Sequence, residues 1–523
     1  MFRTGRTSGV LLPLFSLRSV DDFGIGDFGA VDGFFAWMNR ARQRLWMLLP
    51  LLPTAPDDPS PYSTRSAFGL NPLFIDLASL EDFQALGGEA IFTEPEREQL
   101  HQARSAKQIR YDLVFRLKHK ALRQAFEHFE ATHHGRQTTR AVAFERFRDT
   151  ESDWLEPFTL FSALSRENAH KPFWDWPAEL ASRQSDAIAK AAIRLSKEIR
   201  FGAWKQWVAD TQWQIVRRKA RAAGVLLCGD EPFVVGRDSS DVWSHPHLLR
   251  RDARLGVPPD DFSATGQDWG LPYFDFEAMA KDNDGWIRWR AEKSAAYFDL
   301  RRIDHAVGYF RQWIRDAHNP YGRFLPDNEP AQRARGEHNF RLFAETGAGV
   351  VAEDLGVIPD WVRHTLSALE LPGYRVLRWE RDGLHYRNPQ HFPKVSLVTT
   401  GTHDTETLAQ WWEGASHEER AAQTQAYPSL TLLGAPGQFT PQVHHAQLEA
   451  ALGAQSDLCV LPWQDVLGTR ERINLPGTQS DANWSYRQPQ PSSQLLLNTE
   501  TLSAAERLAE LTIQNHRDKH QRG

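Results

Sequence analysis

Cysteine and long apolar runs are scarce in this chain of 523 residues. Two cysteines, Cys228 and Cys459, are too few for a disulfide framework at this length, so we expect free thiols in a reducing compartment. No apolar run reaches the ~18 residues that a membrane helix needs. The apolar run over residues 10–17 follows two arginines, but Pro13 interrupts it and no small-x-small cleavage motif follows, which argues against a secretory signal. We therefore expect a cytoplasmic protein without membrane contact.

Neither sign of charge dominates. Lys plus Arg number 61 and Asp plus Glu number 67, which gives a net charge of −6 spread along the chain. No basic stripe is available for phosphates, so a nucleic-acid partner is not expected. The 41% hydrophobic and 24% charged residues exclude disordered and fibrous classes. Tryptophan is abundant, with 19 residues, and suits a buried core and a groove that stacks sugar rings equally well.

Short apolar runs bounded by turn residues predict eight β-strands. Most runs are continuously apolar rather than alternating, as in parallel strands that helices cover on the outside. Helical patterns such as residues 28–42 and 361–369 lie between many of them. We predict an α/β protein, a (β/α)8 TIM barrel with large helical and loop insertions. The expected strands are residues 9–12, 45–49, 224–228, 300–303, 349–352, 375–379, 395–399 and 458–461.

The uneven spacing of these runs predicts large insertions in a single catalytic barrel domain over residues 1–523. A mainly helical insertion is expected over 78–200, between strands 2 and 3. A loop-rich insertion, with many Pro, Asp and Trp residues, is expected over 229–299, between strands 3 and 4. A second helical insertion is expected over 405–456, after strand 7.

The segment Gly-Ile-Gly-Asp-Phe-Gly, residues 24–29, matches the dinucleotide fingerprint G-x-G-x-x-G. Asp27 would place a negative charge against a pyrophosphate, and no acid for a ribose follows about 20 residues later, where the chain reads Leu-Leu-Pro (48–50). We interpret the segment as a tight loop at the barrel mouth and expect no nucleotide there.

Three acids follow predicted strands: Asp304, Glu353 and Asp404. In a barrel the carboxyl ends of the strands converge on one mouth, so these acids can meet around one bond. A single such acid is usually a helix cap or an ion-pair partner, but three at equivalent positions predict a site. Cleavage of a glycosidic bond needs this set, because the leaving oxygen must be protonated and the cationic sugar carbon needs anionic support.

Two neighbouring features allow other interpretations. His305 beside Asp304 and His403 beside Asp404 suggest an Asp/His metal site, but no H-E-x-x-H motif or cysteine cluster accompanies them. Imidazoles that hydrogen-bond sugar hydroxyls explain both histidines more simply. Arg302 lies on the same side of its strand as Asp304, where it can keep Asp304 ionised or form a structural ion pair inside the barrel.

With these motifs the chain resembles the amylomaltases, or 4-α-glucanotransferases (disproportionating enzymes, glycoside hydrolase family 77). The likeness covers nearly the whole chain in order and includes Arg-Ile-Asp-His (302–305), Ala-Glu-Asp-Leu-Gly (352–356) and Gly-Thr-His-Asp (401–404). So many ordered blocks are far more specific than any one of them. The other matching segments are residues 24–29, 60–73, 229–235, 238–243, 256–270, 464–465, 472–478 and 483–484.

The resemblance implies an enzyme that transfers segments of α-1,4-glucan to the 4-hydroxyl of another glucan or of glucose, with retention and without metal or organic cofactor. It implies that Asp304 is the nucleophile, Glu353 the acid/base and Asp404 a stabiliser of the transition state. Maltodextrins and fragments of starch or glycogen would be its substrates. Sugar contacts are expected from Tyr62, Asp230, Phe262, Gln267, Trp269, Arg302, His305, His403 and Asn474.

Some positions depart from the common pattern of the family. Asp261 stands where a loop tyrosine is frequent, and Leu271 where an asparagine is common, which puts chain-length preference and cyclisation in doubt. An α-glucan hydrolase with the same carboxylates is one alternative function. A catalytically silent glycan-binding protein is another, although the presence of all three acids argues against it.

Overall fold

Eight parallel strands close into a barrel in a computed structural model that describes residues 5–56, 58–259 and 266–518. Each barrel strand pairs with the barrel strands that precede and follow it in the chain, in the ring order β1-β14-β13-β10-β9-β6-β3-β2. The predicted (β/α)8 architecture is therefore confirmed. The strands are β1 (Thr7–Leu11), β2 (Leu45–Met47), β3 (Leu226–Glu231), β6 (Leu300–Ile303), β9 (Gly349–Ala352), β10 (Gly373–Val376), β13 (Ser396–Thr399) and β14 (Leu458–Pro462).

The predicted strand limits differ most from the observed ones in β3 and β10. The apolar run over 224–228 ends three residues before the end of β3, which continues through the acids Asp230 and Glu231. Apolar patterning misses this extension because both acids are buried against arginines: Asp230 pairs with Arg302 and Glu231 with Arg290. In β10 the strand begins at Gly373 rather than at the predicted position 375.

The first and last strands of the barrel pair along five residues, from Thr7 opposite Leu458 to Leu11 opposite Pro462. Arg517, which follows the last helix, is 1% exposed and lies over this seam. Its guanidinium donates hydrogen bonds to the carbonyls of Ser456 at 2.8 Å and Thr7 at 3.4 Å. Segments separated by more than 400 residues therefore complete the ring.

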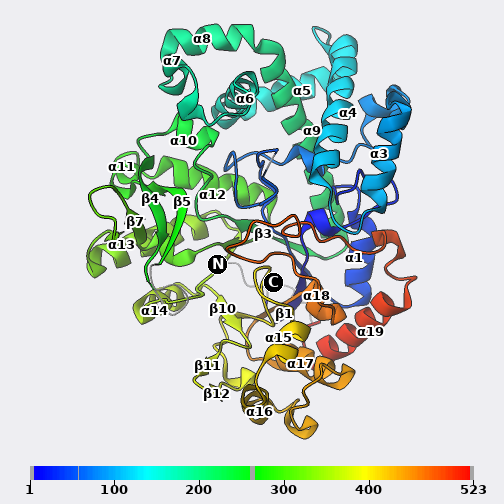
Figure 1. Cartoon of the computed structure of the whole chain (residues 1–523), viewed down its shortest axis with the longest axis vertical. Coiled ribbons are helices and arrows are strands. Elements are labelled where there is room, and N and C mark those ends of the chain that lie inside the picture. Colours follow the sequence, from blue (N-terminus) through cyan, green and yellow to red (C-terminus); the bar gives the residue numbers. More distant parts are fainter. Residues whose placement is uncertain (1–4, 57, 260–265, 519–523) are drawn as a thin grey trace.

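Helices between β2 and β3 form one end of the molecule, at the top of Figure 1. They lie within or next to the region 78–200, where a mainly helical insertion is expected, and in α4 apolar residues such as Leu117 and Phe126 are buried. These helices are α2 (Glu81–Ala85), α3 (Glu94–Ser105), α4 (Tyr111–His133), α5 (Thr139–Thr150), α6 (Ser152–Glu167), α7 (Ala178–Ala181), α8 (Ser185–Arg194) and α9 (Ser196–Ala222).

Between β3 and β6, where composition predicts loops over 229–299, the structure instead has strands and helices. β4 (Leu249–Val257) and β5 (Gln267–Phe274) join β7 (Gln312–Arg315) and β8 (Arg323–Leu325) in a four-stranded sheet of order β5-β4-β7-β8. Several positions of β4 and β5 are exposed or half-buried, so polar residues and proline are tolerated and hide the strand signal. The segment also contains α10 (Ser240–Ser244), α11 (Phe276–Lys281) and α12 (Gly285–Tyr297).

The remaining helices lie around the barrel, and α16 and α17 form the lower end of the molecule in Figure 1, opposite the α4–α9 end. Among the described residues, no helix is both long enough and apolar enough to cross a membrane. These helices are α1 (Val31–Arg40), α13 (Glu329–Glu345), α14 (Asp360–Ala368), α15 (Leu408–Gly414), α16 (His417–Ala426), α17 (Pro441–Gly453), α18 (Trp463–Leu467) and α19 (Thr499–Gln514). A short β-hairpin, β11 (Arg381–Asp382) and β12 (His385–Tyr386), lies near α16.

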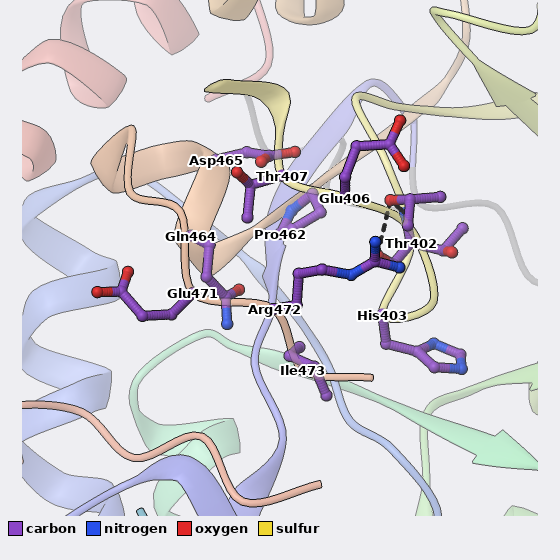
Figure 2. A pocket seen from close by; sticks show the side chains of 11 residues that line it. Thr402, His403, Glu406, Thr407, Pro462, Gln464, Asp465, Glu471, Arg472 and Ile473 are labelled. Atoms are coloured by element: carbon purple, nitrogen blue, oxygen red, sulfur yellow. Dashed lines mark hydrogen bonds between the residues drawn. The ribbon is translucent and has the colours of Figure 1, made fainter. Parts of the chain in front are cut away.

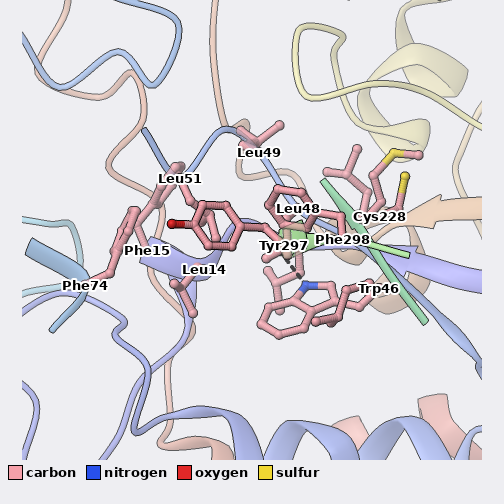
Figure 3. Packing of buried hydrophobic residues seen from close by; sticks show 14 of the residues in the cluster. Leu14, Phe15, Trp46, Leu48, Leu49, Leu51, Phe74, Cys228, Tyr297 and Phe298 are labelled. Carbon is pink, nitrogen blue, oxygen red and sulfur yellow. Dashed lines mark hydrogen bonds between the residues drawn. The ribbon is translucent and has the colours of Figure 1, made fainter. Parts of the chain in front are cut away.

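Most of the tryptophan serves the core. Figure 3 shows side chains from distant parts of the sequence, including Trp46, Cys228 and Phe298, in one buried cluster. Both cysteines are buried free thiols. The tryptophans that are almost completely buried are Trp37, Trp46, Trp204, Trp213, Trp243, Trp412 and Trp463.

The glycine-rich segment 24–29 lies between β1 and α1 and binds protein groups. Asp27 is buried, and its Oδ2 lies 3.2 Å from Nζ of Lys118 on α4. The same ammonium donates to the carbonyl oxygens of Leu73 at 2.7 Å and Ile75 at 2.8 Å. A Cβ on Gly26 would lie 2.0 Å from the Leu14 carbonyl oxygen, so close approach of the backbone requires this glycine.

Candidate active site

The three predicted acids lie just beyond the carboxyl ends of three barrel strands. Asp304 follows β6 directly, Glu353 follows β9 directly, and Asp404 lies in the loop after β13. Because all eight strands are parallel, these ends open on the same mouth of the barrel.

Arg302, the third residue of β6, holds the acids on one side of the mouth. Its Nη1 atom lies 2.7 Å from Oδ1 of Asp230 and 2.9 Å from Oδ1 of Asp304, and its Nη2 lies 4.0 Å from Oε2 of Glu353. The guanidinium is only 6% exposed. Arg302 thus forms a buried ion pair with Asp230 and also contacts Asp304 directly.

Glu353 is held by two backbone amides. Its Oε2 accepts a hydrogen bond from the amide of His305 and its Oε1 from the amide of Leu355, both at 2.9 Å. Burial raises the pKa of Glu353 to about 7; the charge of Asp304 adds to the shift, whereas Arg302 opposes it. The carboxyl group is therefore fixed in place and titrates near neutral pH, as a group that must both give and take a proton requires.

Asp404 has the opposite electrostatic environment. Partial burial opposes its ionisation, but His403 and a 2.6 Å hydrogen bond from Nδ2 of Asn474 outweigh it and lower the pKa of Asp404 well below its usual range. Arg472 donates to the backbone carbonyl of Asp404 at 2.8 Å and so fixes the loop. The site thus pairs an ionised carboxylate, Asp404, with a carboxyl group that is protonated up to about pH 7, Glu353.

Tyr62 links the two halves of the site. Its hydroxyl donates to Oδ2 of Asp230 at 2.7 Å and lies 2.9 Å from Nε2 of His403, and its ring stacks on that imidazole at 5.3 Å between centroids. The same Nε2 lies 3.4 Å from Oδ2 of Asp404, so the imidazole of His403 contacts both residues. A continuous chain of contacts therefore runs from Asn474 and Asp404 through His403, Tyr62 and Asp230 to Arg302.

A small pocket borders this chain on the side of the loop after β13. His403 and Arg472 lie on one side of the pocket and Gln464 and Asp465 on the other (Figure 2). Asp465 is buried and accepts a hydrogen bond from the Thr400 hydroxyl at 2.6 Å. This hydrogen bond ties the start of the loop after β13 to α18.

The sheet beside the barrel supplies the other predicted contacts. His305 has a left-handed backbone, with φ +46°, and its ring meets Trp269 of β5 edge-on at 4.9 Å. Nε1 of Trp269 donates to Oε1 of Gln267 at 3.1 Å. Burial lowers the pKa of His305 to about 4, so its imidazole is neutral at pH 7. Phe262, also predicted as a contact, lies outside the described residues.

Sequence reasoning missed Trp484 and Arg472 as parts of the site. The Trp484 ring lies 5.8 Å from those of Tyr62 and His403, and its backbone is left-handed, with φ +60°. Both residues lie in blocks that carry the family resemblance, which was the available signal, but no local pattern shows what they contact. Among the described residues, no group of three or more His, Cys, Asp or Glu side chains is arranged to hold a metal.

A closed barrel of parallel strands with carboxylates and aromatic rings at its mouth defines a (β/α)8-barrel enzyme. A family model described as 4-α-glucanotransferase matches residues 12–492. The chain therefore belongs to the 4-α-glucanotransferase family and is a glycosyltransferase of that type, which confirms the resemblance.

Relatives and solved structures agree with this assignment. The 4-α-glucanotransferase of Thermus thermophilus is 34% identical over 503 residues, covering 92% of this chain and 94% of the relative. The chloroplastic/amyloplastic enzyme of Solanum tuberosum is 30% identical over 506 residues, covering 93% of this chain and 83% of the relative. An amylomaltase structure from Streptococcus agalactiae has the same fold, with a TM-score of 0.81, 24% identity, and coverage of 98% and 99% of the two chains.

Proposed function

We propose that this enzyme transfers segments of α-1,4-glucan from a donor to the 4-hydroxyl of an acceptor glucan or of glucose, by a retaining double displacement. The observation that carries the proposal is the grouping of Asp304 and Glu353 around Arg302, with Asp404 on the same mouth. A nucleophile, an acid/base and a separate anion are the parts that such a displacement needs.

In the first step, Oδ of Asp304 attacks the anomeric carbon of the donor. The bond from that carbon to the glycosidic oxygen breaks, and this oxygen takes the proton of Glu353. The departing glucan then has a free 4-hydroxyl, and the donor segment is held as an ester of Asp304. Asp404, which His403 and Asn474 keep ionised, supplies negative charge while the sugar carbon is cationic.

In the second step, the Glu353 carboxylate takes the proton of an acceptor 4-hydroxyl. The acceptor oxygen then attacks the anomeric carbon, and the ester bond to Asp304 breaks. The charge of Asp304 is one cause of the raised pKa of Glu353, and esterification removes that charge. The pKa of Glu353 therefore falls in the intermediate, which favours the carboxylate that the second step needs.

The product profile on maltotriose tests the proposed function. Transfer yields glucose together with maltodextrins longer than the substrate, because released segments join other maltotriose molecules. Only glucose and maltose would show that the chain is a hydrolase, and unchanged maltotriose would show that it only binds glycans. The Asp304→Asn variant, prepared in parallel, controls for contaminating enzymes.

The pH dependence of the first step follows from Glu353. Its pKa is raised to about 7, so the proton that the leaving oxygen needs is present below pH 7 and lost above it. We expect kcat/KM for maltotriose to fall about tenfold per pH unit above pH 7. Initial rates between pH 5 and 9 measure this, with a thermal unfolding curve at pH 9 to show that the protein stays folded. A flat profile to pH 9 would contradict Glu353 as the acid.

A further inference from the structure

A cavity of about 140 Å³ lies between the helical end of the molecule and the segment that carries Tyr62. Its walls come from α4, α6 and α9 and from residues 53–56 and 71–73, on either side of Tyr62 in the chain. It shares no residue with the contact chain of the active site. The charged or ionisable described residues that line it are Arg65, Lys118, His119, Arg166, His170 and Lys205, and no described Asp or Glu lines it. We call it the cationic cavity.

Several of the cationic side chains that line the cavity form ion pairs with carboxylates. Arg65 pairs with Asp238 at 2.9 Å, Lys118 with Asp27 at 3.2 Å and Arg166 with Glu198 at 2.9 Å. Lys205 differs: within the described part of the chain, no carboxylate and no hydrogen-bond acceptor contacts its ammonium, which lies 4.5 Å from the centroid of the Phe201 ring. Lys205 is half-buried and lines the cavity, so an anion that enters the cavity can pair with its ammonium without displacing a carboxylate.

The charges around Lys205 also favour an anionic ligand. Burial lowers the pKa of Lys205 to about 7, reinforced by Arg166 and Arg123 and opposed by Glu198. Burial likewise lowers the pKa of His119 to about 3, and Lys205, Arg166 and Arg123 add to the shift. The surrounding groups on α4, α6 and α9 thus create a positive potential that Glu198 does not neutralise.

The shape and the lining of the cavity indicate the class of ligand. Phe115, Leu122 and Phe158 add apolar surface to the lining, and Arg166 uses Nη1 for its pair with Glu198. A neutral sugar would leave Lys205 uncompensated, whereas a doubly charged group with several acceptor oxygens matches a lysine beside an arginine fork. We propose that the cationic cavity binds a small phosphate monoester, with its phosphate on Lys205 and Arg166 and its body against Phe115, Leu122 and Phe158.

Binding of glycerol 3-phosphate to the full chain tests this proposal, because this ester has no glucose ring to occupy the active site. Isothermal titration calorimetry in a phosphate-free buffer at pH 7 should give a Kd of about 1 mM or tighter. Lys205→Gln should weaken binding at least about tenfold, since it removes a charge-assisted hydrogen bond. Lys197→Gln is the matched control, because Lys197 lies on the same helix with a 67% exposed side chain, and should bind as the unmodified chain does.

Two comparison ligands test whether the cavity recognises the phosphate group. Glycerol without phosphate should not bind, and succinate should bind at least about tenfold more weakly than glycerol 3-phosphate, because its carboxylates are planar and singly charged. Equal binding of succinate would overturn the phosphate assignment. Equal affinities in the Lys205→Gln and Lys197→Gln variants, or absence of binding at 10 mM ester, would overturn the site.

Protection from chemical labelling tests the unmodified protein and so does not depend on how the variant folds. An amine whose pKa is near 7 is largely unprotonated at pH 7.5 and reacts readily with acetic anhydride. Saturating glycerol 3-phosphate should slow acetylation of Lys205 at least about tenfold, measured by peptide mass spectrometry, and leave Lys197 unchanged. Acetylation of Lys205 at an unaltered rate would contradict the proposal.

Discussion

Replacement of Asp304 by asparagine is expected to abolish glucan transfer and leave the protein folded. An amide cannot form the glycosyl ester, so kcat/KM on maltotriose should fall by about 10⁴-fold or more. Asparagine keeps the shape of the side chain, which is 25% exposed, and its oxygen can still accept from Arg302. Product formation from maltotriose measures the loss, and circular dichroism with thermal unfolding measures the fold.

Asp32→Asn is the matched control, because it removes a carboxylate from the exposed surface of α1, where Asp32 pairs with Lys219. Its activity and Tm should be those of the unmodified chain. Transfer by a folded Asp304→Asn protein within tenfold of the original rate would contradict the assignment of Asp304 as the nucleophile. Loss of both activity and fold would assign Asp304 a structural role instead.

Replacement of Glu353 by glutamine is expected to lower transfer from maltotriose by about 10²–10⁴-fold, the usual contribution of acid–base catalysis. A 4-nitrophenyl maltoside donor separates chemistry from structure, because its leaving group needs no proton. With this donor the first step should still proceed, and the glycosyl-enzyme should accumulate, visible as an added mass on the intact protein.

Azide distinguishes the second role of Glu353. It attacks the anomeric carbon without a base, so it should release the accumulated intermediate as a glycosyl azide of retained configuration. Glu345→Gln, on the exposed surface of α13, controls for the substitution itself. Equal loss of rate on both donors, without rescue by azide, would mean that glutamine disturbs the amides of His305 and Leu355 rather than the proton transfer.

The sequence predicts those strands best that are apolar to their ends. The runs over 300–303 and 349–352 coincide with β6 and β9, and both acids that follow them were placed at the mouth. The predicted end of β3 lies too early because the last residues of the strand, Asp230 and Glu231, are charged. Only their buried arginine partners make them compatible with a strand. Such partners are distant in the chain, so local patterns do not reveal them.

The sequence predicts which residues belong to the site better than it predicts how those residues contact one another. The sequence predicts Arg302 beside Asp304, but not that it contacts Asp230 and lies near Glu353, because the packing of three neighbouring strands determines these contacts. The path of the proline-rich segment around Tyr62 depends on the contacts that the Tyr62 hydroxyl makes with Asp230 and His403. The left-handed backbone of Trp484 is likewise set by its surroundings, since a large aromatic residue does not favour it.

The pairing of β1 with β14 has a consequence for biosynthesis. While the chain is being made, Thr7–Leu11 has to wait for Leu458–Pro462 before its second edge is covered. Until then Thr7–Leu11 presents an open hydrogen-bonding edge and buried-type side chains to solvent or to chaperones, which is the condition in which strands associate wrongly. Fragments that stop before residue 458 should therefore aggregate or be degraded, because no shorter portion of this chain can seal the ring.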